Sequence, residues 1–163
     1  MTRERCVTGI EGLDRILGGG LPGSSVNLVL GECGTGKTSL ALEFLVRGAE
    51  RGEKGLLVNT VEPFSKMVSN IPRFDFVEGD HFEDGSIVSL QLPDILESAG
   101  MMERTQPEKG ILELCDQVEE KIAEHEVKRF VIDSLTPLHF EIGDETLVHH
   151  LLRRLSQILY ENE

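Results

Sequence analysis

Short apolar runs alternate with longer amphipathic stretches along this chain, a pattern that predicts strands separated by helices. The apolar runs are bounded by glycines or charged residues and predict short buried strands at residues 25–30, 55–60, 86–90 and 128–133. Apolar residues at helical spacing predict helices over residues 37–50 and 111–126 and after Asp144, whose side chain is suited to cap a helix. We therefore expect an α/β fold in which a mainly parallel sheet is covered by helices on both faces.

The remaining segments show no sustained period and predict turns and loops. Residues 1–24 contain three consecutive glycines and are expected to form short turns. A short helix is expected after Pro63, and Pro72 should end it. Residues 73–85 are acidic and predict an irregular segment, whereas residues 93–110 contain two prolines and two glycines and predict a mobile surface segment.

The composition limits the classes of protein to which the chain can belong. Its 163 residues suffice for a single domain, and 39% hydrophobic residues exclude a disordered tail. The net charge is −13 and no basic run offsets it, so neither nucleic acid nor an acidic membrane surface is an expected partner. No apolar run approaches the roughly 18 residues that cross a bilayer. The three cysteines lack the spacing of a zinc site and predict reduced thiols in a cytoplasmic protein.

Residues 31–38 fit the phosphate-loop pattern G-x-x-x-x-G-K-[ST], between a predicted strand and a predicted helix. Glycines in such a loop let backbone N–H groups turn inward around a phosphate, and the positive end of the following helix adds to their attraction. Lys37 would reach the β- and γ-phosphates, and the Thr38 hydroxyl would hold Mg²⁺. The predicted nucleotide site consists of Gly31, Glu32, Cys33, Gly34, Thr35, Gly36, Lys37, Thr38 and Ser39.

Two further residues have candidate roles at this site. Asp133 ends the apolar run at 128–133, where its carboxylate could hold Mg²⁺ and its water shell opposite Thr38; the alternative is an aspartate that caps a loop. Cys33 lies inside the phosphate loop, and we interpret it as a small filler residue rather than as an activated thiol. The histidines do not have the spacing of metal ligands.

Several segments together resemble the KaiC-like and RadA-like ATPases of the RecA superfamily, and the KaiC-like proteins more closely. They are T-G-I-E-G-L-D-R-I-L-G-G-G-L-P-G-S at residues 8–24, R-G-E-K-G-L-L-V at 51–58, V-S-L-Q-L-P-D at 88–94 and I-D-S-L-T-P-L at 132–138. The resemblance covers residues 7–160. It implies a three-layer, RecA-like P-loop fold that binds ATP or ADP with Mg²⁺, hydrolyses ATP, and forms a ring-shaped homo-oligomer of hexamer type with nucleotide between subunits.

The chain departs from this family's pattern in two places. Val61 stands where the family has a catalytic glutamate, so Glu62, the next residue, becomes the candidate general base beside Lys37 as a catalytic residue. The family's core also continues with further strands, one of them inserted between the phosphate-loop strand and the Asp133 strand. We therefore expect residues 1–163 to form one domain that is truncated at its C-terminus, with a gap in the sheet.

Two functions of different classes follow from the resemblance. The first is a slow Mg²⁺-dependent ATPase that acts as a regulatory or signalling module, with a protein partner. The alternative is a catalytically idle nucleotide sensor that works by oligomerising or by binding a partner, and Val61 is the residue that favours it. A fragment of a DNA recombinase would share the fold, but the acidic net charge argues against it.

Overall fold

A computed structural model of the chain describes residues 4–60, 66–67, 69, 74–77, 80–98 and 107–162. The elements in chain order are β1 (Arg5–Cys6), α1 (Glu11–Ile16), β2 (Leu21–Pro22), α2 (Lys37–Ala49), β3 (Gly55–Asn59), β4 (Ile87–Gln91), α4 (Leu92–Ser98), α5 (Pro107–His125), β5 (Arg129–Asp133), α6 (Leu135–Ile142) and α7 (Glu145–Glu161). No helix in these ranges is both long enough and apolar enough to cross a membrane.

The main sheet has three strands in the order β4-β3-β5, and both pairings are parallel. Its register places Asn59 opposite Gln91 on one side and opposite Asp133 on the other, so the carboxyl ends of all three strands lie at one edge. A separate two-stranded antiparallel pair joins β1 to β2. The predictions of strands near 55–60, 86–90 and 128–133 and of a parallel α/β sheet are confirmed.

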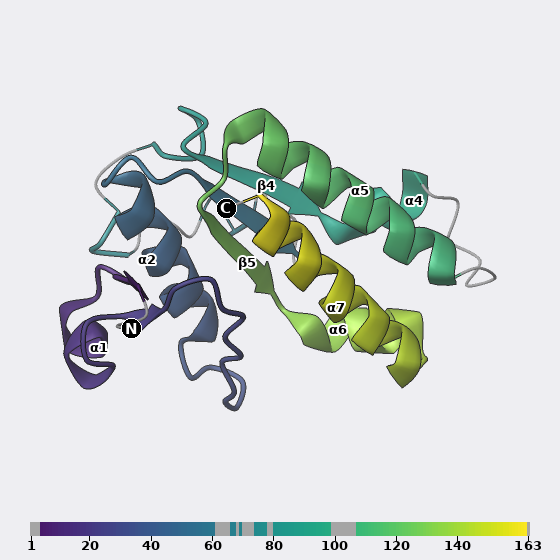
Figure 1. Cartoon of the computed structure of the whole chain (residues 1–163), viewed down its shortest axis with the longest axis horizontal. Coiled ribbons are helices and arrows are strands. Elements are labelled where there is room, and N and C mark those ends of the chain that lie inside the picture. Colours follow the sequence, from purple (N-terminus) through teal and green to yellow (C-terminus); the bar gives the residue numbers. More distant parts are fainter. Residues whose placement is uncertain are drawn as a thin grey trace.

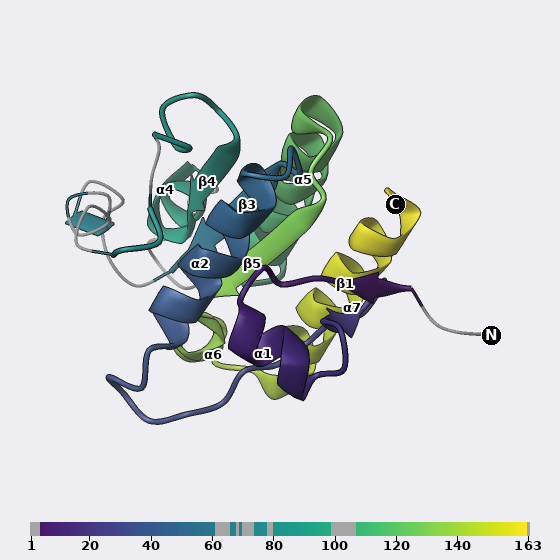
Figure 2. The same cartoon turned by 90° about the vertical axis from the view of Figure 1, so that its left-hand side faces the viewer.

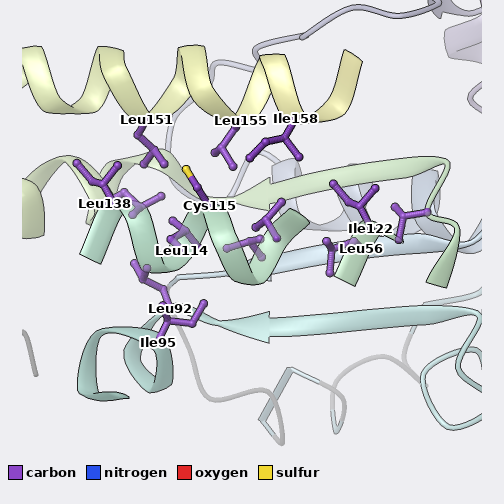
Figure 3. Close-up of a cluster of buried hydrophobic side chains, with 14 residues drawn as sticks. Leu56, Leu92, Ile95, Leu114, Cys115, Ile122, Leu138, Leu151, Leu155 and Ile158 are labelled. Atoms are coloured by element: carbon purple, nitrogen blue, oxygen red, sulfur yellow. The ribbon is translucent and has the colours of Figure 1, made fainter. Parts of the chain in front are cut away.

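Helices cover both faces of this sheet, as the apolar pattern predicted (Figures 1 and 2). Side chains alternate along a strand, so Leu56 and Val58 of β3 face one core while Leu57 faces the other. The larger core contains residues of α4, α5, α6 and α7 together with Leu56 of β3 (Figure 3). The smaller core contains Leu42, Leu45 and Val46 of α2, packed with Leu57 and Ile87, so the three layers are α2, the sheet, and α5 with α7.

One buried guanidinium joins elements that are distant in the sequence. Arg129, at the start of β5, is only 2% exposed and donates from Nε to Glu53 Oε2 at 2.6 Å. Its terminal nitrogens donate to the carbonyl oxygens of Val7 at 2.8 Å, Thr8 at 3.1 Å and Phe44 at 2.7 Å. Its Cζ also lies 4.5 Å from the centre of the Phe44 ring. The N-terminal segment, α2 and β5 are therefore tied together by a single side chain.

The prediction of a buried strand at residues 25–30 is wrong. These residues form neither a helix nor a strand, and the segment contains the exposed apolar side chains Val26, Leu28, Val29 and Leu30, of which Leu30 is 82% exposed. A strand needs a partner for its backbone groups, and among the described residues β5 pairs only with β3. In the described ranges β5 is therefore an edge strand that is not joined to residues 25–30, and the truncated core stays a prediction.

Several helices lie where turns or loops were expected. Helix α1 falls within residues 1–24, and α6 follows β5 directly. Helix α4 and the start of α5 fall within residues 93–110, while residues 99–106 lie outside the described part. Pro93 and Pro107 occupy the first turns of their helices, where a missing N–H costs no intrahelical bond, so proline here marks helix starts. The short helix expected after Pro63 falls mostly outside the described residues.

The remaining helix predictions are confirmed. Helix α2 begins at Lys37, one residue after the phosphate-loop glycine, and α5 contains most of residues 111–126. Asp144 caps α7 as expected, because its Oδ1 accepts hydrogen bonds from the N–H groups of Thr146 at 2.7 Å and Leu147 at 3.2 Å.

The packing of Arg129 against α2 predicts an unusual response to one helix substitution. Gly48→Ala would place a Cβ atom 2.3 Å from Arg129 Cδ, and the side chain cannot move away without breaking its hydrogen bonds. Alanine normally stabilises a helix interior by about 1 kcal/mol relative to glycine. Here we expect the free energy of unfolding in urea to fall by about 1–3 kcal/mol, as in other overpacked cores.

Gly12→Ala in α1 is the matched control, because nothing lies within 4 Å of its Cβ position. It should leave the free energy of unfolding unchanged or raise it. Equal stabilisation by both substitutions would contradict the packing described for Arg129.

Candidate nucleotide-binding site

The phosphate-loop sequence forms a loop that runs into the N-terminus of α2. Gly34 and Gly36 have φ angles of +80° and +87°, in the left-handed region where a side chain would be strained. A Cβ on Gly31 would lie 2.7 Å from Thr35 Oγ1, so glycine is also required there for close approach. The glycines of the motif thus shape the backbone in three distinct places.

The side chains of the loop hold it in a closed turn. Thr35 Oγ1 donates to the carbonyl oxygen of Glu32 at 2.8 Å, and the Lys37 ammonium donates to the carbonyl oxygens of Gly31 at 2.9 Å and Glu32 at 2.7 Å. Lys37 therefore reaches back over the loop from the first turn of α2. Its contacts are to neutral carbonyls, which a phosphate could replace as acceptors with a charge-assisted interaction.

The backbone N–H groups at this turn fit an anionic ligand. Within the described part of the chain, the N–H groups of Gly34, Gly36, Lys37 and Thr38 donate to no protein acceptor. Those of Lys37 and Thr38 belong to the first turn of α2, where the helix has no internal acceptors and carries a partial positive charge. Four free donors next to an ammonium are the donor set that a nucleotide phosphate requires.

Asp133 lies at the same edge of the sheet as this loop. The C-terminal half of α2 packs against the strand starts: Gly48 lies beside Arg129, and Leu45 lies beside Gly55. The N-terminal end of α2 therefore lies toward the carboxyl ends of β3 and β5, where Asp133 ends its strand (Figure 1). The Asp133 side chain is partly exposed, as a group that binds a ligand must be. The pairing of Thr38 and Asp133 around a metal stays a prediction.

The oxygen donors at this edge suit magnesium bound together with a nucleotide. Thr38 supplies a hydroxyl and Asp133 a carboxylate, the hard oxygen donors that Mg²⁺ prefers. In the described ranges, no group of three or more histidine, cysteine, aspartate or glutamate side chains could hold a metal ion. Two protein ligands would leave the remaining positions of Mg²⁺ to phosphate oxygens and water, which is usual for this ion.

Thr60, which the sequence did not single out, is bonded to the backbone next to Asp133. Its N–H donates to the Asp133 carbonyl oxygen at 3.0 Å. Its hydroxyl accepts from the N–H of Ser134 at 2.8 Å and donates to the Ser134 carbonyl oxygen at 2.7 Å. No local motif marks this threonine, because its partners lie 74 residues further along the chain. Val61 and the candidate base Glu62 lie outside the described residues.

The thiols of Cys33 and Cys115 lie in different environments. Cys33 is exposed in the phosphate loop, whereas Cys115 is buried in the larger core. Burial raises the pKa of the Cys115 thiol to about 11, so only about one molecule in a thousand carries the thiolate at pH 8. The thiolate is the reactive form, and exposure is needed for attack.

We therefore expect iodoacetamide at pH 8 to alkylate Cys33 quickly and Cys115 very slowly, as read by peptide mass spectrometry. Nucleotide bound in the loop should protect Cys33. In urea, where both thiols are exposed, the two rates should become similar. Rapid labelling of Cys115 in the folded protein would contradict its burial in the core.

Comparison with known proteins places these features in one family. The profile of the KaiC ATPase family matches residues 6–163. A UPF0273 protein of Methanopyrus kandleri is 31% identical over 166 aligned residues, which include 98% of this chain and 64% of the relative. The circadian clock protein KaiC2 of Synechocystis is 32% identical over 152 residues, which include 93% of this chain and 26% of KaiC2.

A solved structure agrees with the sequence comparison. A KaiC-like protein from Pyrococcus horikoshii matches with a TM-score of 0.78 and 25% identity, over 98% of this chain and 67% of that protein. The chain spans about two thirds of the length of the UPF0273 relative and about a quarter of KaiC2. The matching profile, the relatives and the shared RecA-like fold lead to one conclusion: this chain belongs to the KaiC-like family of ATPases.

Proposed function

We propose that this protein binds ATP and ADP with Mg²⁺ in the loop at residues 31–39 and hydrolyses ATP slowly. The observation that carries the proposal is the set of free N–H groups at Gly34, Gly36, Lys37 and Thr38, beside the Lys37 ammonium. On binding, Lys37 would exchange its contacts with the Gly31 and Glu32 carbonyls for contacts with the β- and γ-phosphates. Mg²⁺, held by Thr38 and Asp133, would neutralise developing charge on the phosphates.

Hydrolysis is expected to be slow because of the residue available as general base. Val61 cannot accept a proton from water, so Glu62 is the candidate base, one residue further along the chain than the family's pattern places it. A base displaced by one residue would orient the attacking water less well. If Glu62 does not serve either, the protein is the idle nucleotide sensor that forms the second candidate function.

The setting of this activity is also a proposal. Free cysteines at positions 6, 33 and 115 fit a reducing compartment such as the cytoplasm. Membership of the KaiC-like family supports a ring-shaped homo-oligomer with nucleotide between subunits and a regulatory role exerted through a protein partner. The net charge of −13 speaks against nucleic acid as that partner.

Lys37→Ala should weaken ATP binding by about 100-fold, because it removes an ammonium that would face the terminal phosphates. Isothermal titration calorimetry with Mg²⁺ measures this affinity. Lys54→Ala is the matched control, since Lys54 precedes β3 at the opposite edge of the sheet. Equal ATP affinity in wild type and Lys37→Ala would overturn the nucleotide-binding assignment.

Glu62→Gln should lower the rate of ATP hydrolysis by about 100-fold or more, because glutamine cannot act as a general base. Phosphate release under single-turnover conditions measures the rate, and calorimetry should show unchanged ATP affinity. Glu83→Gln, at an exposed position, is the control. Hydrolysis that survives Glu62→Gln would exclude this base, and a wild type that binds ATP without hydrolysing it would support the sensor.

A further inference from the structure

We propose that Thr60 is a positioning residue for magnesium, which acts by fixing the backbone that carries the Asp133 carboxylate. This inference rests on the proposed function, in which Asp133 helps to hold Mg²⁺ beside the nucleotide. Thr60 itself touches neither the phosphates nor the ion in this scheme. It controls where the carboxylate stands when the ion binds.

The Asp133 carboxylate depends on its backbone for its position. Within the described part of the chain, its side chain has no hydrogen-bond or ion-pair partner. Carboxylates that ligate metals are usually oriented by neighbouring groups, and loss of such a group weakens metal binding. Because no side chain in the described ranges contacts the Asp133 carboxylate, the main chain on its two sides sets where its Cα lies and where the Cα–Cβ bond points.

The N-terminal side of Asp133 is fixed by the sheet. Asp133 is the last residue of β5 and lies opposite Asn59, the last residue of β3. The ladder between these strands therefore ends at Asp133. Beyond this point the chain turns into α6, whose N-cap is Ser134, and the Ser134 side chain makes no capping hydrogen bond of its own.

The backbone on the C-terminal side of Asp133 is fixed by Thr60. Thr60 makes three hydrogen bonds beyond the strand ends. Its N–H donates to the Asp133 carbonyl, and its hydroxyl bonds to both the N–H and the carbonyl of Ser134. The hydroxyl satisfies both groups because its one oxygen can donate one hydrogen bond and accept another. Thr60 is 7% exposed, so water competes little for these bonds.

The bonds of Thr60 join the ends of two neighbouring strands. Thr60 follows the last residue of β3, while Asp133 and Ser134 lie where β5 passes into α6. A bond between the two chain segments at this point fixes the end of one strand relative to the other. We infer that the threonine hydroxyl, rather than the size of the side chain, is what the metal site requires.

The test measures how much Mg²⁺ tightens the binding of a non-hydrolysable ATP analogue. Affinities are measured by calorimetry in Mg²⁺ and in EDTA, and their ratio is compared among variants. Thr60→Val keeps the shape but removes the hydroxyl, and we expect its ratio to fall by about tenfold or more while its affinity in EDTA stays within about twofold. Thr60→Ser keeps the hydroxyl and should keep the ratio.

Two controls separate this role from a general loss of structure. Ser156→Ala removes a hydroxyl that donates to the Leu152 carbonyl within α7, away from the strand ends, and should leave the ratio unchanged. In a double-mutant cycle, Thr60→Val should add no further loss to Asp133→Asn, because both act on one carboxylate. Thermal unfolding is recorded for each variant, and Thr60→Cys, with its weak hydrogen-bonding thiol, replaces Thr60→Val if the valine protein does not fold.

The outcomes distinguish this inference from the function on which it rests. If Mg²⁺ tightens analogue binding by Thr60→Val as much as in the wild type, but no longer does so for Asp133→Asn, the role of Thr60 is overturned. The proposed function would then still stand. Equal weakening of Thr60→Val in Mg²⁺ and in EDTA would also overturn the role of Thr60, because it indicates a purely structural residue. A wild type that binds the analogue no better with Mg²⁺ would refute the metal part of the proposed function, and this inference with it.

Discussion

The placement of α2 over the sheet depends on the buried guanidinium of Arg129. A charge with 2% exposure has lost nearly all its water, and it is stable only where protein groups replace that water. Glu53 supplies the opposite charge, and three carbonyl oxygens and the Phe44 ring complete the shell. Few arrangements of α2, β5 and the N-terminal segment satisfy all these donors at once. The C-terminal half of α2 is thereby held at the strand starts, which directs its N-terminus and the phosphate loop to the opposite edge.

The segment at residues 25–30 illustrates what an apolar run can and cannot specify. Its side chains are as apolar as those of β3, yet β3 is fully buried and Leu30 is 82% exposed. The difference lies in the neighbours: β3 has β4 on one side and β5 on the other, while the outer edge of β5 pairs with no strand in the described ranges. Strand formation reflects pairing and cover more than local preference, so composition alone could not predict this outcome.

The same distinction explains which other elements could be predicted from the sequence. Some elements were predictable because the apolar pattern, the capping residues and the flanking glycines or charged residues agree within each segment. These elements are the strands 55–59 and 129–133 and the helices α2, α5 and α7. Helices α1 and α4 were missed because they are short and carry glycine or proline near their starts, which we interpreted as breaks. The role of Arg129 could not be predicted, because its hydrogen-bond partners lie 76 to 122 residues away in the sequence. From the sequence alone, an arginine at the start of a strand is expected to be exposed.

In the candidate site, too, some features follow from the local sequence and others from tertiary contacts. Its phosphate side is local: eight consecutive residues carry the glycines, the lysine and the helix start, so the motif alone predicted both the ligand and the donors. Its proposed metal side is tertiary, because only the direction of α2 brings the loop toward the end of the sheet where Asp133 lies, and Thr60 bonds to Ser134 across 74 residues. A change in the packing of the sheet would therefore leave the phosphate loop intact as a sequence while moving the carboxylate away from it. The proposed nucleotide binding and the proposed metal binding thus depend on different parts of the structure.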